Sequence, residues 1–219
     1  MQDLVTWLDE LIASLTPRVP LRLAGMSYGG ALAVQYALRF PQRVERLVLL
    51  ALGATVLRPP AQFWLRLFTL AITRRKGLPA FCRWIFADMA RRSPRWIDST
   101  VELLSINIQN IQRHKTPVPP VLTDAEWSSL RPPALFLVGE NEVIYPARAA
   151  VRRLQRVASQ VTAEILPGAG HDLLFVQTAA VTKRILEFLN EKPSPPRLPV
   201  ATSGNPSNPA TTMAARCTP

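Results

Sequence analysis

Cysteine and histidine are scarce in this 219-residue sequence, with two residues of each kind. Cys82 and Cys217 lie far apart, so the sequence indicates neither a disulfide framework nor a metal cluster, and it fits a reducing compartment. His114 and His171 are the only imidazoles. Any chemistry that needs a histidine therefore has just two candidates.

Long apolar runs are missing as well. The longest uncharged apolar stretch, Leu47 to Leu57, is well short of the roughly 18 to 20 residues that span a bilayer. The N-terminus carries Asp3, Asp9 and Glu10, where a signal peptide would carry positive charge followed by an uninterrupted apolar stretch. We therefore expect a cytoplasmic protein without a membrane span.

Acidic residues are few, with 15 Asp and Glu against 26 Lys and Arg, a net charge of +11. The excess is concentrated in residues 56–128, which hold 11 basic and 5 acidic residues. No helix-turn-helix, zinc-finger or RNA-recognition pattern accompanies it, and the aromatic residues there are spaced like helix packing faces. We interpret the charge as a solvated basic face and expect no nucleic-acid partner.

Residues 21–40 contain the most informative pattern in the chain. The apolar residues near 21–26 predict a strand, and apolar spacings of three and four over 28–40 predict a helix directly after it. Between them, Gly25-Met26-Ser27-Tyr28-Gly29 forms G-x-S-x-G. On such a turn the serine is lifted out of the sheet on a strained backbone, and both glycines are expected because a Cβ would collide with the neighbouring strand or helix. An isolated match can also be a glycine-rich turn without function.

The rest of the chain predicts alternating helices and strands around one substantial core, given a hydrophobic content of 48%. We expect a single domain over residues 1–192 and a disordered tail over 193–219, which is rich in Pro, Ser, Thr, Ala and Asn. Residues 57–128 interrupt the alternation with helical patterns and form an insert. The expected elements are a helix at 2–15, strands at 46–52, 133–140 and 161–166 (the last at an edge), and helices after Pro146 and at 173–190.

From about residue 2 to about residue 190 the sequence resembles the α/β-hydrolase family. The family orders its nucleophile, acid and histidine as Ser27, Glu142 and His171 are ordered here. The resemblance implies an α/β three-layer sandwich with a mostly parallel sheet, with the insert as a lid over the active site. It also implies that about four strands and a helix upstream are absent. The first strand would then leave one edge unpaired, and we expect self-association through that edge.

The base and the acid are assigned separately. A serine hydroxyl needs an adjacent base, and His171 follows a Gly-x-Gly turn after a predicted strand, whereas His114 lies in a basic, proline-bordered linker. Glu142 stands where the family carries its acid, at the end of a predicted strand. Glu140 and Asp172 remain competitors for that role.

One donor of the oxyanion hole is expected from the backbone N–H of Tyr28, and nothing before Ser27 resembles the loop that supplies the second. The leading hypothesis is a serine hydrolase that cleaves a small-molecule carboxylic ester through an acyl-enzyme, with no cofactor and no metal. The aromatic insert favours an acyl or aromatic ester, and its arginines could meet a carboxylate or phosphate on the substrate. The alternative is a non-catalytic or weakly active binding protein with half an oxyanion hole.

A third hypothesis places residues 61–72 on a membrane surface. Trp64, Leu67, Phe68 and Ile72 would be buried in the lipid, and Arg66, Arg74, Arg75 and Lys76 would face the head groups. The competing interpretation is that these apolar side chains pack inside the insert.

Overall fold

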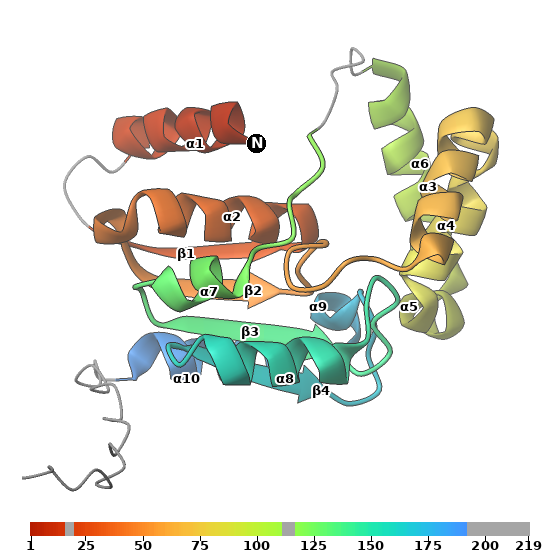
Figure 1. Cartoon of the computed structure of the whole chain (residues 1–219). Coiled ribbons are helices and arrows are strands. Elements are labelled where there is room, and N and C mark those ends of the chain that lie inside the picture. The colour runs from red at the N-terminus through yellow and green to blue at the C-terminus, as the bar shows by residue number, and fades with distance from the viewer. Residues whose placement is uncertain (16–19, 111–116, 192–219) are drawn as a thin grey trace, which may run out of the picture.

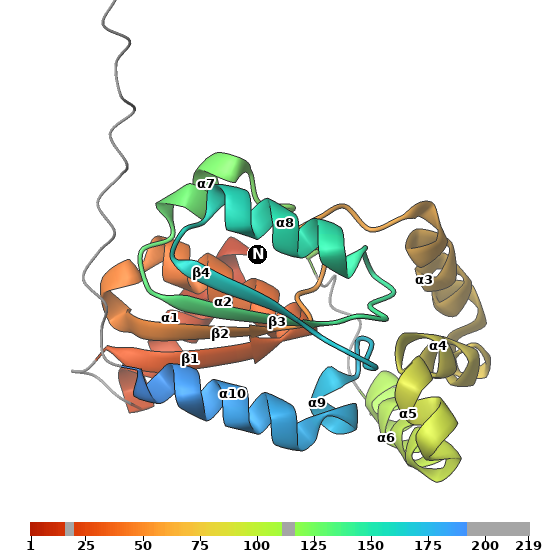
Figure 2. The ribbon, with the colours of Figure 1, turned by 90° about the horizontal axis from the view of Figure 1, so that it is seen from below.

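The computed structural model describes residues 1–15, 20–110 and 117–191 (Figure 1). Its four strands form one parallel sheet with helices on both faces (Figure 2). The strands, in spatial order, are β1 (Leu21–Met26), β2 (Val44–Leu50), β3 (Ala134–Gly139) and β4 (Val161–Leu166). The predicted three-layer fold with a mostly parallel sheet is confirmed.

The two central strands are apolar on both faces because both faces are covered. Every residue of β3 is buried, and in β2 only Glu45 is exposed. Leu49 and Phe136 belong to one core cluster. Leu50 and Leu137, the next residue along each strand, belong to the other. Such continuous apolar runs are typical of parallel strands between two helical layers.

The helices divide between the two faces of the sheet. One cluster joins the sheet to α1 (Gln2–Leu15), α2 (Ser27–Arg39), and α8 (Ala147–Val157), and the other joins it to α10 (Thr178–Asn190) and the short α9 (Leu173–Val176). In Figure 2, α8 and α10 lie on opposite sides of the strands.

The helices at 2–15 and 28–40 cover the same face of the sheet. Val5 of α1 belongs to the same cluster as Tyr36 of α2. The Tyr36 hydroxyl donates a 3.0 Å hydrogen bond to Asp9, and Asp9 also pairs with Arg43 at 2.5 Å. Burial and the bond to Asp9 raise the pKa of Tyr36 to about 12. The first helix therefore packs on the second.

The helical insert lies beyond the carboxyl ends of the strands (Figure 1). It has a small core of its own, centred on Leu78, Cys82 and Ile97. Its elements are α3 (Ala61–Thr73), the 3-10 turn η2 (Arg74–Lys76), α4 (Leu78–Ile85), α5 (Ala87–Arg92) and α6 (Pro94–Asn110). The following α7 (Asp124–Ser129) returns to the main body, where Trp127 is buried in the core shared with α8.

Three further expectations concern His114 with the tail, the edge of the sheet and a membrane span. His114 and the predicted tail at 193–219 lie outside the described residues. β1 pairs with β2, and among the described strands it has no partner on its other side. Within the described ranges no helix is long and apolar enough to cross a membrane.

Candidate active site

Ser27 sits at the junction of β1 and α2 with a φ of 51°, in the left-handed region that L-residues rarely adopt. The turn is held by close contacts at Gly25, where a Cβ would lie 2.5 Å from the carbonyl oxygen of Gly29. The backbone N–H of Gly53 also donates to the Ser27 carbonyl at 3.1 Å. The strained serine is therefore fixed from two sides, as the elbow pattern predicts.

The two glycines of the motif play different parts. A Cβ on Gly29 would meet nothing within 4 Å, so the expected collision at this position was wrong. The next residue, Gly30, has the tight contact instead: its Cβ would lie 2.7 Å from Leu52 and 2.9 Å from the carbonyl of Gly25. The close approach of helix to strand thus depends on Gly25 and Gly30.

The loops after β3 and β4 are clamped together at the same edge of the sheet. A Cβ on Gly139 would lie 2.2 Å from the carbonyl oxygen of Ala169, so only glycine allows this approach. The Asn141 N–H then donates to that carbonyl at 2.9 Å. As a result the residues that follow each loop, Glu142 and His171, are brought to one point.

Hydrogen bonds connect the three candidate residues in the order Ser27, His171, Glu142. His171 Nε2 lies 2.9 Å from Ser27 Oγ, and His171 Nδ1 lies 3.0 Å and 3.1 Å from the two carboxylate oxygens of Glu142. The His171 side chain is 5% exposed and that of Glu142 is 0% exposed. An imidazole held in this way can accept the serine proton while its other nitrogen stays bonded to the carboxylate.

The Glu142 carboxylate accepts hydrogen bonds from the backbone of the two residues that follow it. The N–H groups of Val143 and Ile144 both donate to Oε1 at 2.9 Å. The neighbouring Tyr145 is buried, and burial, followed by the charge of Glu142, raises the pKa of its phenol well above the ordinary value. The extra methylene of glutamate is thus accommodated by a carboxylate that folds back onto its own loop.

The competing acids point elsewhere. Glu140 is exposed, accepts the Gly168 N–H at 3.3 Å and lies 3.8 Å from Arg148. Asp172 is completely buried, and its Oδ2 accepts the backbone N–H of Met89 at 2.7 Å. Of the three acids, Glu142 is the one within hydrogen-bond distance of the His171 ring.

The Tyr28 N–H lies in the first turn of α2, where N–H groups have no acceptor within the helix. Gly53 lies directly over this turn, and a Cβ there would come within 3.4 Å of the Tyr28 nitrogen. Tyr28 and Gly53 both line the cavity that lies over Ser27. From the sequence no part is assigned to Gly53, which directly follows the strand predicted at 46–52.

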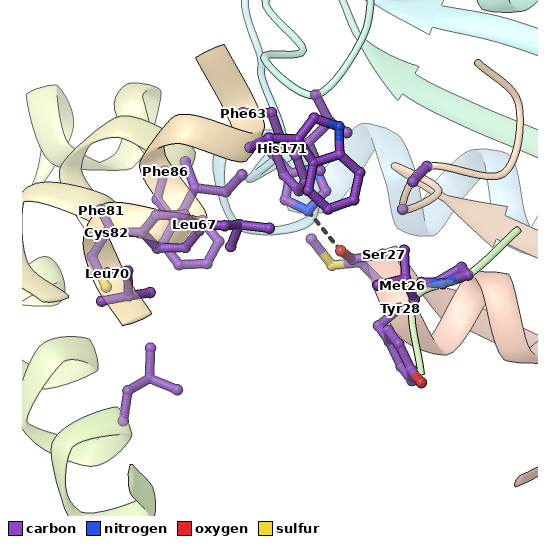
Figure 3. A pocket seen from close by; sticks show the side chains of 18 of the residues that line it. Met26, Ser27, Tyr28, Phe63, Leu67, Leu70, Phe81, Cys82, Phe86 and His171 are labelled. Carbon is purple, nitrogen blue, oxygen red and sulfur yellow. Dashed lines mark hydrogen bonds between the residues drawn. The ribbon is translucent and has the colours of Figure 1, made fainter. Parts of the chain in front are cut away.

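A cavity of about 780 Å³ opens over Ser27 and His171 (Figure 3). Its walls come from the elbow, from α3, α4 and α6 of the helical insert, and from the segment that returns to the sheet. Apart from Ser27, Tyr28, Cys82 and His171, the described side chains that line it are apolar. Burial raises the pKa of the Cys82 thiol. No Lys, Arg, Asp or Glu is among the described residues that line the cavity, so no described arginine of the insert is placed to meet a substrate there.

A polar junction between the insert and the site loops was also missed. Asp88 of α5 is 5% exposed, pairs with Arg91, and accepts hydrogen bonds of 3.3 Å and 3.4 Å from the Asn141 amide. The Asp172 carboxylate lies close by, since a Cβ on Gly170 would be within 3.4 Å of an oxygen of each acid. In the described part of the chain no group of three or more His, Cys, Asp or Glu residues is placed to hold a metal ion.

The comparisons with known proteins agree on one family. A family model described as "Alpha/beta hydrolase family" matches residues 1–184. Two curated relatives come from Bacillus subtilis (strain 168): the uncharacterized carboxylesterase nap, 29% identical over 192 residues, and the carboxylesterase YbfK, 31% identical over 200 residues. The first match covers 86% of this chain and 62% of the relative, and the second covers 85% and 63%.

A solved structure has a similar fold. The crystal structure of naproxen esterase (carboxylesterase NP) from Bacillus subtilis matches with a TM-score of 0.76 at 29% identity, over 86% of this chain and 66% of that one. The chain therefore spans less than two thirds of the length of these relatives.

Proposed function

Since this chain belongs to the α/β-hydrolase family, we propose that it hydrolyses carboxylic esters, with Ser27 as nucleophile, His171 as general base and Glu142 as the acid that orients the base. The observation that carries the proposal is the position of the imidazole, 2.9 Å from Ser27 Oγ and 3.0 Å from the Glu142 carboxylate. The three relatives reported above are named as carboxylesterases, and their names support the same reaction.

The steps of the proposed reaction follow from the hydrogen bonds that connect Ser27, His171 and Glu142. As Ser27 Oγ attacks the ester carbonyl carbon, its proton passes to His171 Nε2, and the Glu142 carboxylate stabilises the imidazolium. The tetrahedral oxyanion faces the Tyr28 N–H at the start of α2, where the helix dipole favours negative charge. Collapse breaks the bond to the alcohol oxygen, which takes the proton from His171. A water molecule, deprotonated by the same imidazole, then cleaves the acyl-serine and restores the site.

The cavity narrows the substrate class. An ester bound against its apolar wall gains from leaving water, and a charged group would lose its hydration without finding an ion partner there. We therefore assign a neutral ester with a large aliphatic or aromatic acyl group. The helical insert at 57–128, whose α3 and α4 form part of the wall, acts as the lid. The cytoplasmic location inferred from the sequence stays a prediction.

Labelling with a fluorophosphonate and hydrolysis of uncharged aryl esters test the assignment together. Wild type should be labelled on Ser27 and should turn over a neutral aryl ester, and Ser27→Ala should lose both activities while keeping its melting temperature. Ser129→Ala is the matched control, because its exposed hydroxyl donates to the Glu126 carbonyl within α7. Labelling that survives in Ser27→Ala would refute the nucleophile. Labelling of Ser27 without turnover would favour the weakly active binding protein.

A further inference from the structure

The helix α3 is apolar on two different faces. Phe63, Leu67 and Leu70 line the cavity. On the outward side four large apolar residues are exposed to solvent: Trp64 by 42%, Leu65 by 64%, Phe68 by 64% and Ile72 by 65%. Packing inside the insert therefore does not account for this second face.

The four exposed residues form a continuous stripe. At 3.6 residues per turn they fall within an arc of about 100°, the width of a typical buried helix face. Gln62, Thr69 and Thr73, also exposed, border the stripe on its polar side. An apolar stripe of this kind with a polar border is characteristic of an interaction surface rather than of scattered surface residues. We call these four residues the α3 stripe.

The chain next to the α3 stripe is basic. Arg74, Arg75 and Lys76 follow in η2, all exposed, and none of them forms an ion pair with a described residue. Residues 46–87 contain seven Lys and Arg and no Asp or Glu. The cationic run therefore lacks a neutralising acid in its own part of the sequence.

We propose that the α3 stripe and η2 bind an anionic lipid surface, with α3 lying parallel to the membrane plane. Apolar side chains enter the boundary of the acyl chains while cations contact the head groups, which is how amphipathic helices bind to such surfaces. The assignment modifies the pattern inferred from the sequence. Leu67 faces the cavity, and Arg66 stacks on Trp84 at 4.8 Å, so neither residue faces the lipid.

Other occupants fit the surface less well. Leu65 and Ile72 are aliphatic and cannot stack on nucleic-acid bases as aromatic side chains do. A second copy of the chain would bring two cationic runs to one interface without acids from residues 46–87 to pair with them. A lipid surface supplies both an apolar layer and negative charge. Trp64 lines the cavity as well as the stripe, so the assigned surface continues into the cavity wall.

Co-sedimentation with vesicles tests the proposal without reference to hydrolysis. Wild type should bind phosphatidylcholine vesicles containing about a quarter phosphatidylglycerol at least about tenfold more tightly than pure phosphatidylcholine vesicles. Phe68→Ser with Ile72→Ser should weaken that binding by about tenfold or more, since each apolar side chain no longer leaves water. Arg75→Gln with Lys76→Gln should weaken it by about tenfold and reduce its sensitivity to salt.

The control is Trp7→Ser with Leu186→Ser, which removes two apolar residues that are 54% and 53% exposed on α1 and α10. This variant should bind anionic vesicles like wild type, and all variants should keep one cooperative thermal transition. Failure of folded wild type to bind, or equal losses in the control and the stripe variant, would overturn the proposal. So would a concentration-dependent dimer that Phe68→Ser with Ile72→Ser abolishes, because a second copy would then cover the stripe.

Discussion

The backbone N–H of Met89 in α5 donates a 2.7 Å hydrogen bond to the carboxylate of Asp172, the residue after His171. This bond joins the helical insert to the loop that carries the proposed base. The second carboxylate oxygen of Asp172 is buried without a hydrogen-bond partner among the described residues. The nearby carboxylate of Asp88 accepts a hydrogen bond from the side-chain amide of Asn141, the residue before Glu142. Both site loops are thus tied to one turn of the insert.

The charge of Asp172 should lower the stability of the protein at neutral pH. Burial is the main cause that raises the pKa of this carboxyl above its ordinary value of 3.8, and the charge of Asp88 adds to it. The folded state therefore holds a proton that the unfolded chain has lost, so the free energy of unfolding falls as pH rises from about 4 through the raised pKa. Asp172→Asn should remove this fall, measured by denaturant unfolding at a series of pH values.

Asp124 provides a control of opposite sign. The hydrogen bond from Arg153 is the main cause that lowers its pKa, so its contribution is present above the ordinary value and is lost as pH falls. Asp124→Asn should flatten the acid limb of the stability curve only. An unchanged curve for Asp172→Asn between pH 4 and neutrality would contradict the assignment of a raised pKa to this group.

The sequence could single out candidate site residues because each is expected just after the end of a strand. Ser27, Glu142 and His171 each follow a strand that its apolar pattern predicts, and the carboxyl ends of parallel strands meet at one edge of a sheet. The choice of Glu142 over Glu140 and Asp172 came from the resemblance to the family. The tie from Met89 to Asp172 depends on how the helices of the insert pack. A helix such as α3 with apolar residues on two sides has no single inward face to read from its pattern.

Substitution of each histidine in turn tests which of them is the general base. His171→Ala removes the group that receives the Ser27 proton and should lower kcat/KM for an aryl ester by roughly 10⁴- to 10⁶-fold. His114→Ala should change it by less than about twofold, since no role is assigned to that residue. Steady-state kinetics with both variants checks the expectation, and comparable losses in the two would mean that the base has been misassigned.

Glu142→Gln tests whether the acid orients the imidazole. The amide keeps the size of the side chain but no longer stabilises the imidazolium or fixes the ring tautomer, so kcat should fall by on the order of 10⁴-fold with little change in KM. Glu140→Gln is the matched control, because that residue bonds to Gly168 and Arg148 at the surface. A larger loss in Glu140→Gln than in Glu142→Gln would reverse the assignment.

The two glycines of G-x-S-x-G should respond in opposite ways to the same substitution. Gly25→Ala places a Cβ 2.5 Å from the carbonyl oxygen of Gly29, a backbone atom that cannot swing away. We expect the free energy of unfolding to fall by on the order of 3 kcal/mol, or the chain to fail to fold.

The Cβ that Gly29→Ala adds meets nothing within 4 Å, at an exposed position of α2. Because alanine favours a helix by about 1 kcal/mol over glycine, its melting temperature should rise by about 2 to 4 °C. Thermal unfolding of both variants decides the matter. Strong destabilisation by Gly29→Ala would show that the elbow needs both glycines for its shape, and would contradict the division of roles between Gly25, Gly29 and Gly30.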